Sequence, residues 1–115
     1  MKRSAVIRLH DILAAIDAAA DMTAGRDFGA FRSDIQLRYA IERCIEIVSE
    51  ASRHVPADEK ARFPDVPWPE IAAIGNRLRH EYGRLDEVLV WKVATRFLPE
   101  LRPTISAIID GRRLD

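Results

Sequence analysis

The sequence predicts an all-α protein, a bundle of four main helices that becomes five if the last helix is kinked or divided at its prolines. Apolar residues recur at spacings of three and four along most of the chain, which is the period of an amphipathic helix. No stretch alternates polar and apolar residues for long enough to predict a strand, and no hairpin turn sequence separates two apolar stretches. The length of 115 residues suits one hydrophobic core, so residues 1–115 are expected to form a single domain.

The first two helices are predicted from their apolar stripes. The first covers residues 4–22 and is followed by Gly25, a residue type that often ends a helix. The second covers residues 31–54 and ends before Pro56. The stripes are Leu9, Ile12, Leu13, Ile16, Ala19 and Ala20 in the first helix, and Leu37, Ile41, Cys44, Ile45, Val48 and Ala51 in the second.

The segment over residues 57–69 is predicted to be the longest connection. It holds three prolines among charged residues, and proline lacks the N–H that a helix interior needs. A third helix is expected from Trp68 to about Gly83, with Pro69 in the first turn, where proline is tolerated. Its inward residues are predicted to be Ile71, Ile74, Leu78 and Tyr82.

A fourth helix is predicted to begin after Asp86, because an aspartate at this position can cap the first turn. Pro99 and Pro103 are expected to break or kink this helix, so we predict it in two pieces. Its apolar face consists of Trp91, Ala94, Phe97, Leu98, Leu101, Ile105, Ile108 and Ile109. Trp68 and Trp91 are interpreted as packing anchors at the starts of the third and fourth helices.

Composition excludes several classes of protein. Lys plus Arg and Asp plus Glu both total 18, so the zero net charge gives no overall attraction to nucleic acid, and any anion site must be local. No window approaches the roughly 18 apolar residues of a membrane span, so no membrane association is expected. One cysteine cannot form an intramolecular disulfide, which favours a cytoplasmic location.

Residues 74–86 gather the side chains best suited to bind phosphate and transfer protons. On a helix, Asn76, Arg77, His80 and Arg84 would share one face, because their spacings are three and four. Histidine exchanges protons near neutral pH, and a neighbouring guanidinium stabilises negative charge on phosphorus. This combination suits RNA cleavage by the substrate's own 2′-hydroxyl. The alternative is a charged helix end, in which these side chains only complement the helix dipole.

Metal chemistry and cysteine chemistry have little support in the sequence. Glu46 and Glu50 lie one turn apart and could hold a divalent ion, but with Arg43 and Arg53 beside them they are more typical of a salt-bridged face. The three histidines are far apart in the chain, so no metal site is predicted. Cys44 lies in an apolar stripe and is interpreted as a core residue.

Several blocks occur in order along the chain: residues 43–51, 66–71, 76–86, 90–91 and 97–101. In these blocks the sequence resembles the HepT-like proteins of the HEPN superfamily, small helical ribonuclease toxins paired with minimal nucleotidyltransferase antitoxins. The signature of that family is Arg-Asn, a histidine four residues after the asparagine, any residue, and a tyrosine. Asn76, His80 and Tyr82 match this signature, whereas Gly75 stands at the place of the arginine.

The resemblance implies a HEPN-type bundle that forms a homodimer, with the two motifs facing one cleft. It also implies metal-independent cleavage of RNA, not DNA, without a cofactor, with His80 as the acid or base and Asn76 as a positioning residue. Arg77 or Arg79 would bind the scissile phosphate, the first being better placed beside His80 and the second closer to the position of the missing arginine. Further phosphate contacts would come from Arg84 and Arg43.

The same resemblance implies a control by the partner, since the nucleotidyltransferase antitoxin of such pairs transfers AMP to the motif tyrosine, here Tyr82. A charged adduct two residues from His80 would repel the phosphates of RNA. The alternative function is a catalytically weak module of the same type that binds nucleotide or RNA and assembles with the nucleotidyltransferase. It remains open because Gly75 has no side chain to contact phosphate.

Overall fold

The computed structural model describes residues 1–80 and 86–111, with the backbone alone at residues 79 and 80. The elements within these ranges are all helical, which confirms the all-α prediction. They are α1 (Arg3–Thr23), α2 (Phe28–Ser33), α3 (Ile35–Ser52), α4 (Ala57–Ala61), α5 (Trp68–His80), α6 (Glu87–Lys92), the π-helical η1 (Val93–Phe97) and α7 (Leu98–Asp110).

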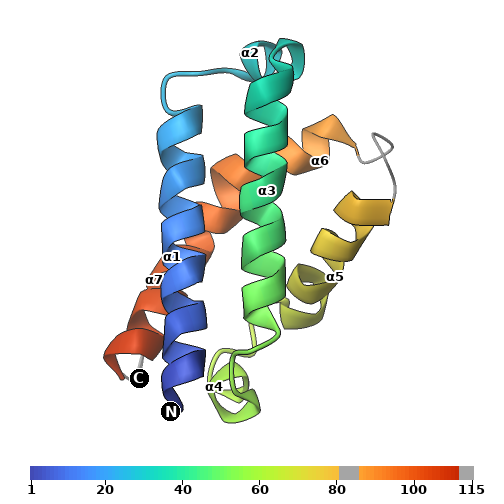
Figure 1. Cartoon of the computed structure of the whole chain (residues 1–115). Coiled ribbons are helices and arrows are strands. Elements are labelled where there is room, and N and C mark those ends of the chain that lie inside the picture. Colours follow the sequence, from blue (N-terminus) through green and yellow to red (C-terminus); the bar gives the residue numbers. More distant parts are fainter. Residues whose placement is uncertain (81–85, 112–115) are drawn as a thin grey trace.

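The two longest helices, α1 and α3, lie side by side and run in opposite directions (Figure 1). The path formed by α6, η1 and α7 crosses behind them, and α7 packs against α1. Helix α5 leans against α3 on the side away from α1. The helix that carries the sequence motif therefore depends mainly on α3 for its position.

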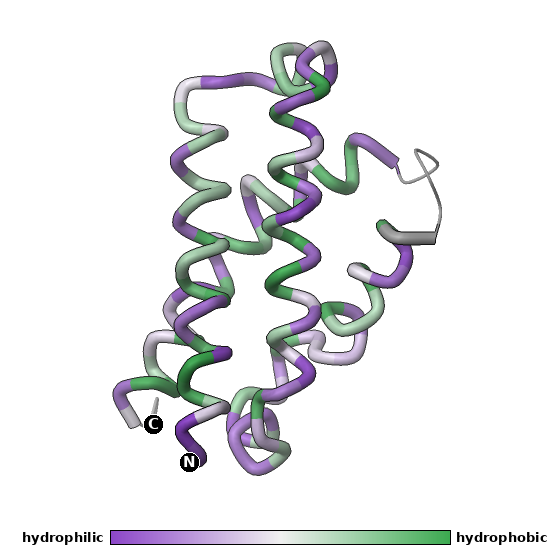
Figure 2. Tube along the Cα trace, in the orientation of Figure 1, coloured by the Kyte–Doolittle hydropathy of each residue, from purple (hydrophilic) through white to green (hydrophobic). Residues whose placement is uncertain are grey.

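The core lies between α1 and α3 on one side and η1 and α7 on the other. Every residue of the stripe predicted for the second helix is buried, whereas Ala20 of the first stripe is exposed and Leu13 is half-buried. Hydrophilic residues recur among hydrophobic ones along α1 and α3 (Figure 2). This pattern is expected for helices with one face in the core. Cys44 is buried, and this burial raises the pKa of its thiol, so the prediction of a core cysteine is confirmed.

The prediction of one continuous helix over residues 31–54 is wrong at its start. The chain forms α2 and α3 in succession, and Asp34 between them is the N-cap of α3. Its carboxylate accepts a hydrogen bond from the N–H of Leu37, at 3.1 Å. An aspartate whose side chain caps the following turn favours a new helix start over the continuation of the preceding helix. The spacing of apolar residues does not reveal this competition.

The segment over residues 57–69, predicted to be a connection without a helix, contains the short α4. After it, Trp68 begins α5 as predicted, with a buried ring. The indole Nε1–H of Trp68 donates to the carbonyl of Phe63, at 3.2 Å. This bond fixes the start of α5 to the end of the connection, so Trp68 is the anchor that the sequence predicts.

The fourth helix is irregular ahead of Pro99, not at Pro103. The π-helical segment η1 separates α6 from α7, and Pro99 lies in the first turn of α7, where no N–H is required. The predicted division into two pieces is therefore confirmed. The expected break at Pro103 is wrong, since α7 continues through this residue to Asp110.

Candidate functional site

Helix α5 carries most of the residues singled out by the sequence. It extends through residue 80, so Asn76 and His80 occupy successive turns of one helix and share a face, as predicted. Asn76 and Arg77 are both exposed. Tyr82 and Arg84 lie outside the described residues, and so does the expected end of this helix at Gly83.

Three hydrogen bonds attach α5 to α3 one turn before the motif. The hydroxyl of Ser49 donates to the carbonyl of Ala72, at 3.0 Å, and accepts from the N–H of Gly75, also at 3.0 Å. At the C-cap of α3, Nη2 of Arg53 donates to the same carbonyl of Ala72, at 2.8 Å. The backbone of α5 is thus held by side chains of α3.

Gly75 has a packing role that its own sequence does not indicate. A Cβ atom at this position would lie 2.6 Å from Oγ and 2.8 Å from Cβ of Ser49, closer than real contacts allow. The residue at the place of the family arginine therefore faces α3. No sequence pattern within α5 indicates this contact, because it depends on a serine 26 residues away.

A groove runs between α5 and the α6–η1 segment, with an apolar floor supplied by Ile45 and Val48 of α3. Arg77 and Glu70 are the charged residues that line it. The remaining lining is apolar and comprises Pro67, Ile71, Ala73, Ile74, Leu89, Val93, Phe97 and Leu98. Arg77 therefore lies at the edge of an apolar groove, on the side of α5 away from Gly75.

Arg43 is placed differently from the other predicted phosphate ligands. It lines a hollow between α1 and α3 together with Arg8, Glu46 and Glu50, and it does not line the groove beside Arg77. The carboxylate of Glu50 lies 3.7 Å from Nε2 of His54. Among the side chains that the structure describes, which do not include that of His80, no group of three His, Cys, Asp or Glu residues has the arrangement of a metal site.

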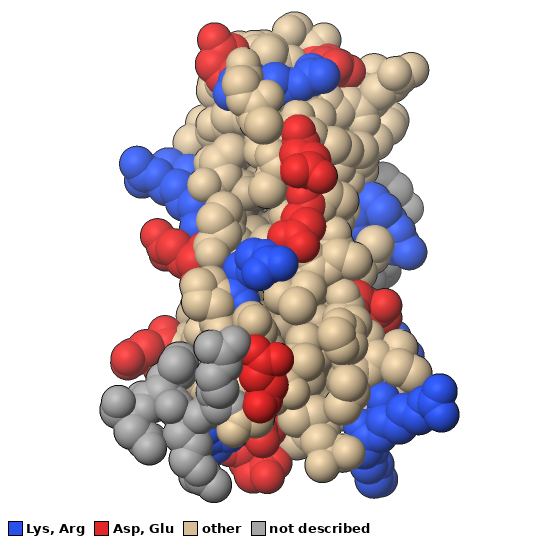
Figure 3. All heavy atoms as spheres, turned by 90° about the vertical axis from the view of Figure 1, so that its left-hand side faces the viewer, with Lys and Arg blue, Asp and Glu red and all other residues tan. Residues whose placement is uncertain are grey.

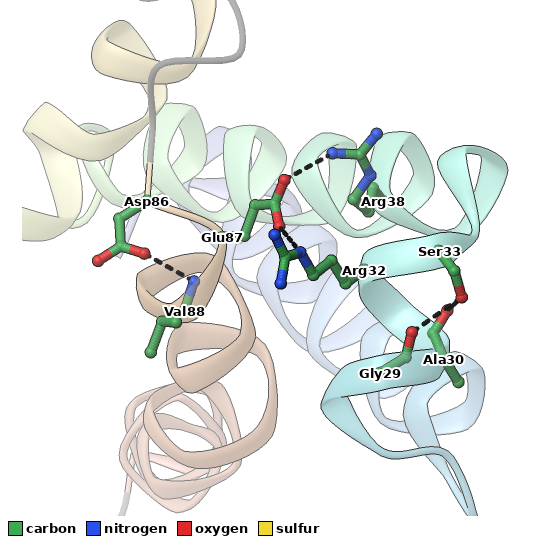
Figure 4. Close-up of polar contacts among 8 residues, drawn as sticks. All are labelled: Gly29, Ala30, Arg32, Ser33, Arg38, Asp86, Glu87 and Val88. Carbon is green, nitrogen blue, oxygen red and sulfur yellow. Dashed lines mark hydrogen bonds and ion pairs between the residues drawn. The ribbon is translucent and has the colours of Figure 1, made fainter.

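The start of α6, which follows residues 81–85 in the chain, is firmly held (Figure 4). The carboxylate of Asp86 accepts from the N–H of Val88, at 2.9 Å, so the predicted N-cap is confirmed. Glu87 pairs with Arg38 of α3, at 3.1 Å, and with Arg32 of α2, at 3.3 Å. Both sides of the 81–85 segment are therefore attached to the same scaffold, α5 through Ser49 and α6 through Glu87.

The aromatic residue predicted as the second anchor lies just beyond this ion-pair cluster. The ring of Trp91 packs against Phe31 and Phe28 of α2, with centroid separations of 5.2 and 6.5 Å. These tilted and edge-on contacts add to the ion pairs in fixing α6 against α2. The interpretation of Trp91 as a packing anchor is confirmed.

The face formed by α1 and α7 offers no continuous basic surface among its described residues. Figure 3 shows the basic side chains scattered over this face among acidic and uncharged ones, with no continuous basic band across it. Arg102 of α7 is paired with Asp17 of α1 through two hydrogen bonds, at 2.7 and 3.0 Å, and these bonds lower the pKa of Asp17. This face therefore gives no support for binding a phosphate backbone. None of the described helices has the length and apolarity to cross a membrane.

Comparison with known proteins gives one consistent result. The chain matches the family described as "Ribonuclease HepT-like" over residues 12–108. It is 35% identical to the "Probable ribonuclease HepT" of Thermococcus cleftensis over 102 residues, which cover 89% of this chain and 93% of that protein. It is 33% identical to the "Putative RNase MJ1380" of Methanocaldococcus jannaschii over 107 residues, which cover 93% of this chain and 98% of that protein. No solved structure matches the chain significantly.

Proposed function

Because the chain belongs to the HepT-like ribonuclease family, we propose that it is an endoribonuclease whose catalytic group is the imidazole of His80. The observation that carries the proposal is the course of α5, which places Asn76 and His80 on one face in successive turns, inside the region that matches the family. The exposure of Asn76 and Arg77 supports access by a large substrate. Since the net charge is zero, the attraction for RNA would come from Arg77 and the arginines near it in the sequence, Arg79 and Arg84.

The proposed reaction uses the 2′-hydroxyl of the RNA as the nucleophile. Its oxygen attacks the adjacent phosphorus, the bond from phosphorus to the 5′-oxygen of the next nucleotide breaks, and a 2′,3′-cyclic phosphate remains. Two protons move in this step, one from the 2′-hydroxyl and one to the departing 5′-oxygen. His80 takes the first as a base or gives the second as an acid, and water exchanges the other proton. Arg77 or Arg79 stabilises the negative charge that develops on the phosphate oxygens. Asn76 orients either the imidazole or the phosphate.

The proposal includes a partner and an assembly. The protein would be the toxin of a pair with a minimal nucleotidyltransferase, and it would act as a homodimer in which two α5 motifs line one cleft. The competing proposal, a weakly catalytic module that binds nucleotide or RNA and assembles with the same partner, is supported by Gly75, since this position faces α3 and offers no phosphate ligand. Incubation of the purified protein with RNA in EDTA separates the two, because only the ribonuclease forms fragments that end in cyclic phosphate.

Tyr82→Phe is expected to abolish modification by the partner. With the cognate nucleotidyltransferase, ATP and Mg²⁺, the wild-type chain should gain the mass of one AMP group, as the Tyr82 oxygen displaces pyrophosphate from ATP. The variant should gain none, because it lacks the acceptor oxygen but keeps the ring. Intact-mass spectrometry measures the difference, and Tyr39→Phe, which alters an exposed tyrosine on α3, is the matched control. Modification that persists in Tyr82→Phe, or that disappears in the control, would refute the assignment.

A further inference from the structure

Two buried serines on α3 make hydrogen bonds of different kinds. Ser52 donates to the carbonyl of Ser49, in its own helix, at 2.6 Å. The hydroxyl of Ser49, which is 2% exposed, instead donates to Ala72 and accepts from Gly75, both on α5. A serine within a helix commonly bonds a carbonyl of the preceding turn, so the bonds that Ser49 makes to a second helix need an explanation.

The two backbone groups that Ser49 contacts belong to the turn that leads into the motif. In an α-helix the carbonyl of residue 72 accepts from the N–H of residue 76, so the atom that Ser49 and Arg53 contact is also the expected helical partner of Asn76. Positions 76 and 80 lie about 100° and 140° around the helix from Gly75. Because the helix is rigid, fixing Gly75 against α3 also fixes the directions in which positions 76 and 80 project from α5.

Gly75 and Ser49 fit each other only as a pair. The hydroxyl reaches the N–H of Gly75 because residue 75 has no side chain, and a Cβ there would meet both side-chain heavy atoms of Ser49 at 2.6 and 2.8 Å. A larger residue at position 75 would force Ser49 or α5 to shift, because both heavy atoms of the buried serine side chain lie too close to the place of a Cβ. The pair thus sets both the distance and the rotation of α5.

We propose that Ser49 is a positioning residue of the candidate site: paired with Gly75, it sets the rotation of α5 and so aims Asn76 and His80 at the substrate. This inference rests on the proposed ribonuclease function for its effect on catalysis, but the positioning itself is a property of the two helices. Small errors in the placement of a catalytic group reduce the reaction rate strongly, since a displacement of about 1 Å can lower it roughly 10²-fold.

The test compares Ser49→Ala with Ser52→Ala in the full-length chain. Each variant removes one buried hydroxyl from α3, but only the first removes the bonds to α5. Ser49→Ala is expected to lower kcat for RNA cleavage by roughly tenfold or more at nearly unchanged KM, as a misplaced catalytic turn would. Ser52→Ala should leave kcat within about twofold of the wild type while lowering thermal stability to a similar extent. Equal values of kcat in both variants would overturn the proposal.

A second pair of variants separates hydrogen bonding from packing. Gly75→Ala should lower the midpoint of thermal unfolding by several degrees, because its Cβ collides with Ser49. Combining Gly75→Ala with Ser49→Gly removes both colliding atoms. This double variant should recover the part of the midpoint that the collision costs, but not the part that a glycine within α3 costs, and it should not recover kcat. Recovery of full kcat would show that the hydroxyl positions nothing.

Amide hydrogen exchange keeps the inference testable if the wild-type chain cleaves no RNA. Exchange at Gly75 and Asn76 is expected to be faster in Ser49→Ala than in the wild type, and unchanged in Ser52→Ala. With no cleavage by the wild type, faster exchange would leave the positioning role standing and reject the proposed function. Unchanged exchange would reject the positioning role, whether or not RNA is cleaved.

Discussion

His80→Ala is expected to lower the rate of RNA cleavage by roughly 10²–10⁴-fold, the usual contribution of a general acid or base. The imidazole is the group of α5 whose proton exchange matches neutral pH, and Asn76 precedes it by one helical turn. Alanine favours helix formation, so α5 should persist through position 80 in the variant. Single-turnover cleavage of a labelled RNA, with circular dichroism to verify the helical content, measures the effect.

The other two histidines of the chain are the matched controls for this variant. His10 is exposed on α1, and His54 is exposed after α3, with Nε2 at 3.7 Å from the carboxylate of Glu50. Their replacement by alanine should leave the cleavage rate nearly unchanged. A His80→Ala protein that cleaves as fast as the wild type would remove His80 from the mechanism.

Arg77→Ala is expected to lower the cleavage rate by about 10²–10³-fold, the effect of losing one donor to charge that develops in the transition state. Positions 77 and 80 lie about 60° apart around the helix, whereas positions 79 and 80 lie about 100° apart. Position 79 is also only about 40° around the helix from Gly75, which faces α3. Position 79 is therefore directed more toward α3 than position 77 is. We therefore expect Arg77, not Arg79, to supply the larger part of the phosphate contact.

Arg79→Ala and Arg3→Ala complete this comparison. The first should reduce the rate less than Arg77→Ala, and the second, which removes one charge from the start of α1, should have little effect at moderate salt. Rates measured at two salt concentrations separate a general loss of attraction for RNA from a loss at the scissile phosphate. A larger effect of Arg79→Ala would assign the phosphate contact to the position closer to the family arginine.

An arginine introduced at position 75 is not expected to restore a stronger site. The sequence presents Gly75 only as a missing ligand, and on that basis Gly75→Arg would supply the absent side chain. In the structure the added side chain would have to displace Ser49 first, since its Cβ would lie 2.6 Å from the serine Oγ. Restoring the family residue would therefore disturb the attachment of α5 to α3 before it could contact RNA.

The apolar period predicted the parts of the fold that depend on burial. The stripe from Leu37 to Ala51 is buried as expected, and Asp86 caps its helix as its chemistry suggests. The period could not predict the break at Asp34, because there a local cap competes with a stripe that would otherwise continue. It also could not predict the Ser49–Gly75 contact, because a helical period indicates which face is buried but not how closely two helices approach.

The candidate site was predictable in part for the same physical reason. The positions of Asn76 and His80 follow from helical spacing, which is local in sequence. Arg43 illustrates what spacing does not reveal, since its place in the hollow between α1 and α3 depends on tertiary packing. The groove beside Arg77 likewise arises from how far α5 stands from η1, which no single segment encodes.

The most direct test of the central claim is the cleavage of one RNA in EDTA by the wild-type protein and by His80→Ala. The RNA is compared with a version that carries 2′-deoxyribose at the cleaved position. The wild type should cut only the all-ribose RNA and leave a 2′,3′-cyclic phosphate, and His80→Ala should cut it at least 10²-fold more slowly. Cleavage of the 2′-deoxy RNA at an equal rate, or no cleavage of either RNA by the wild type, would contradict the account.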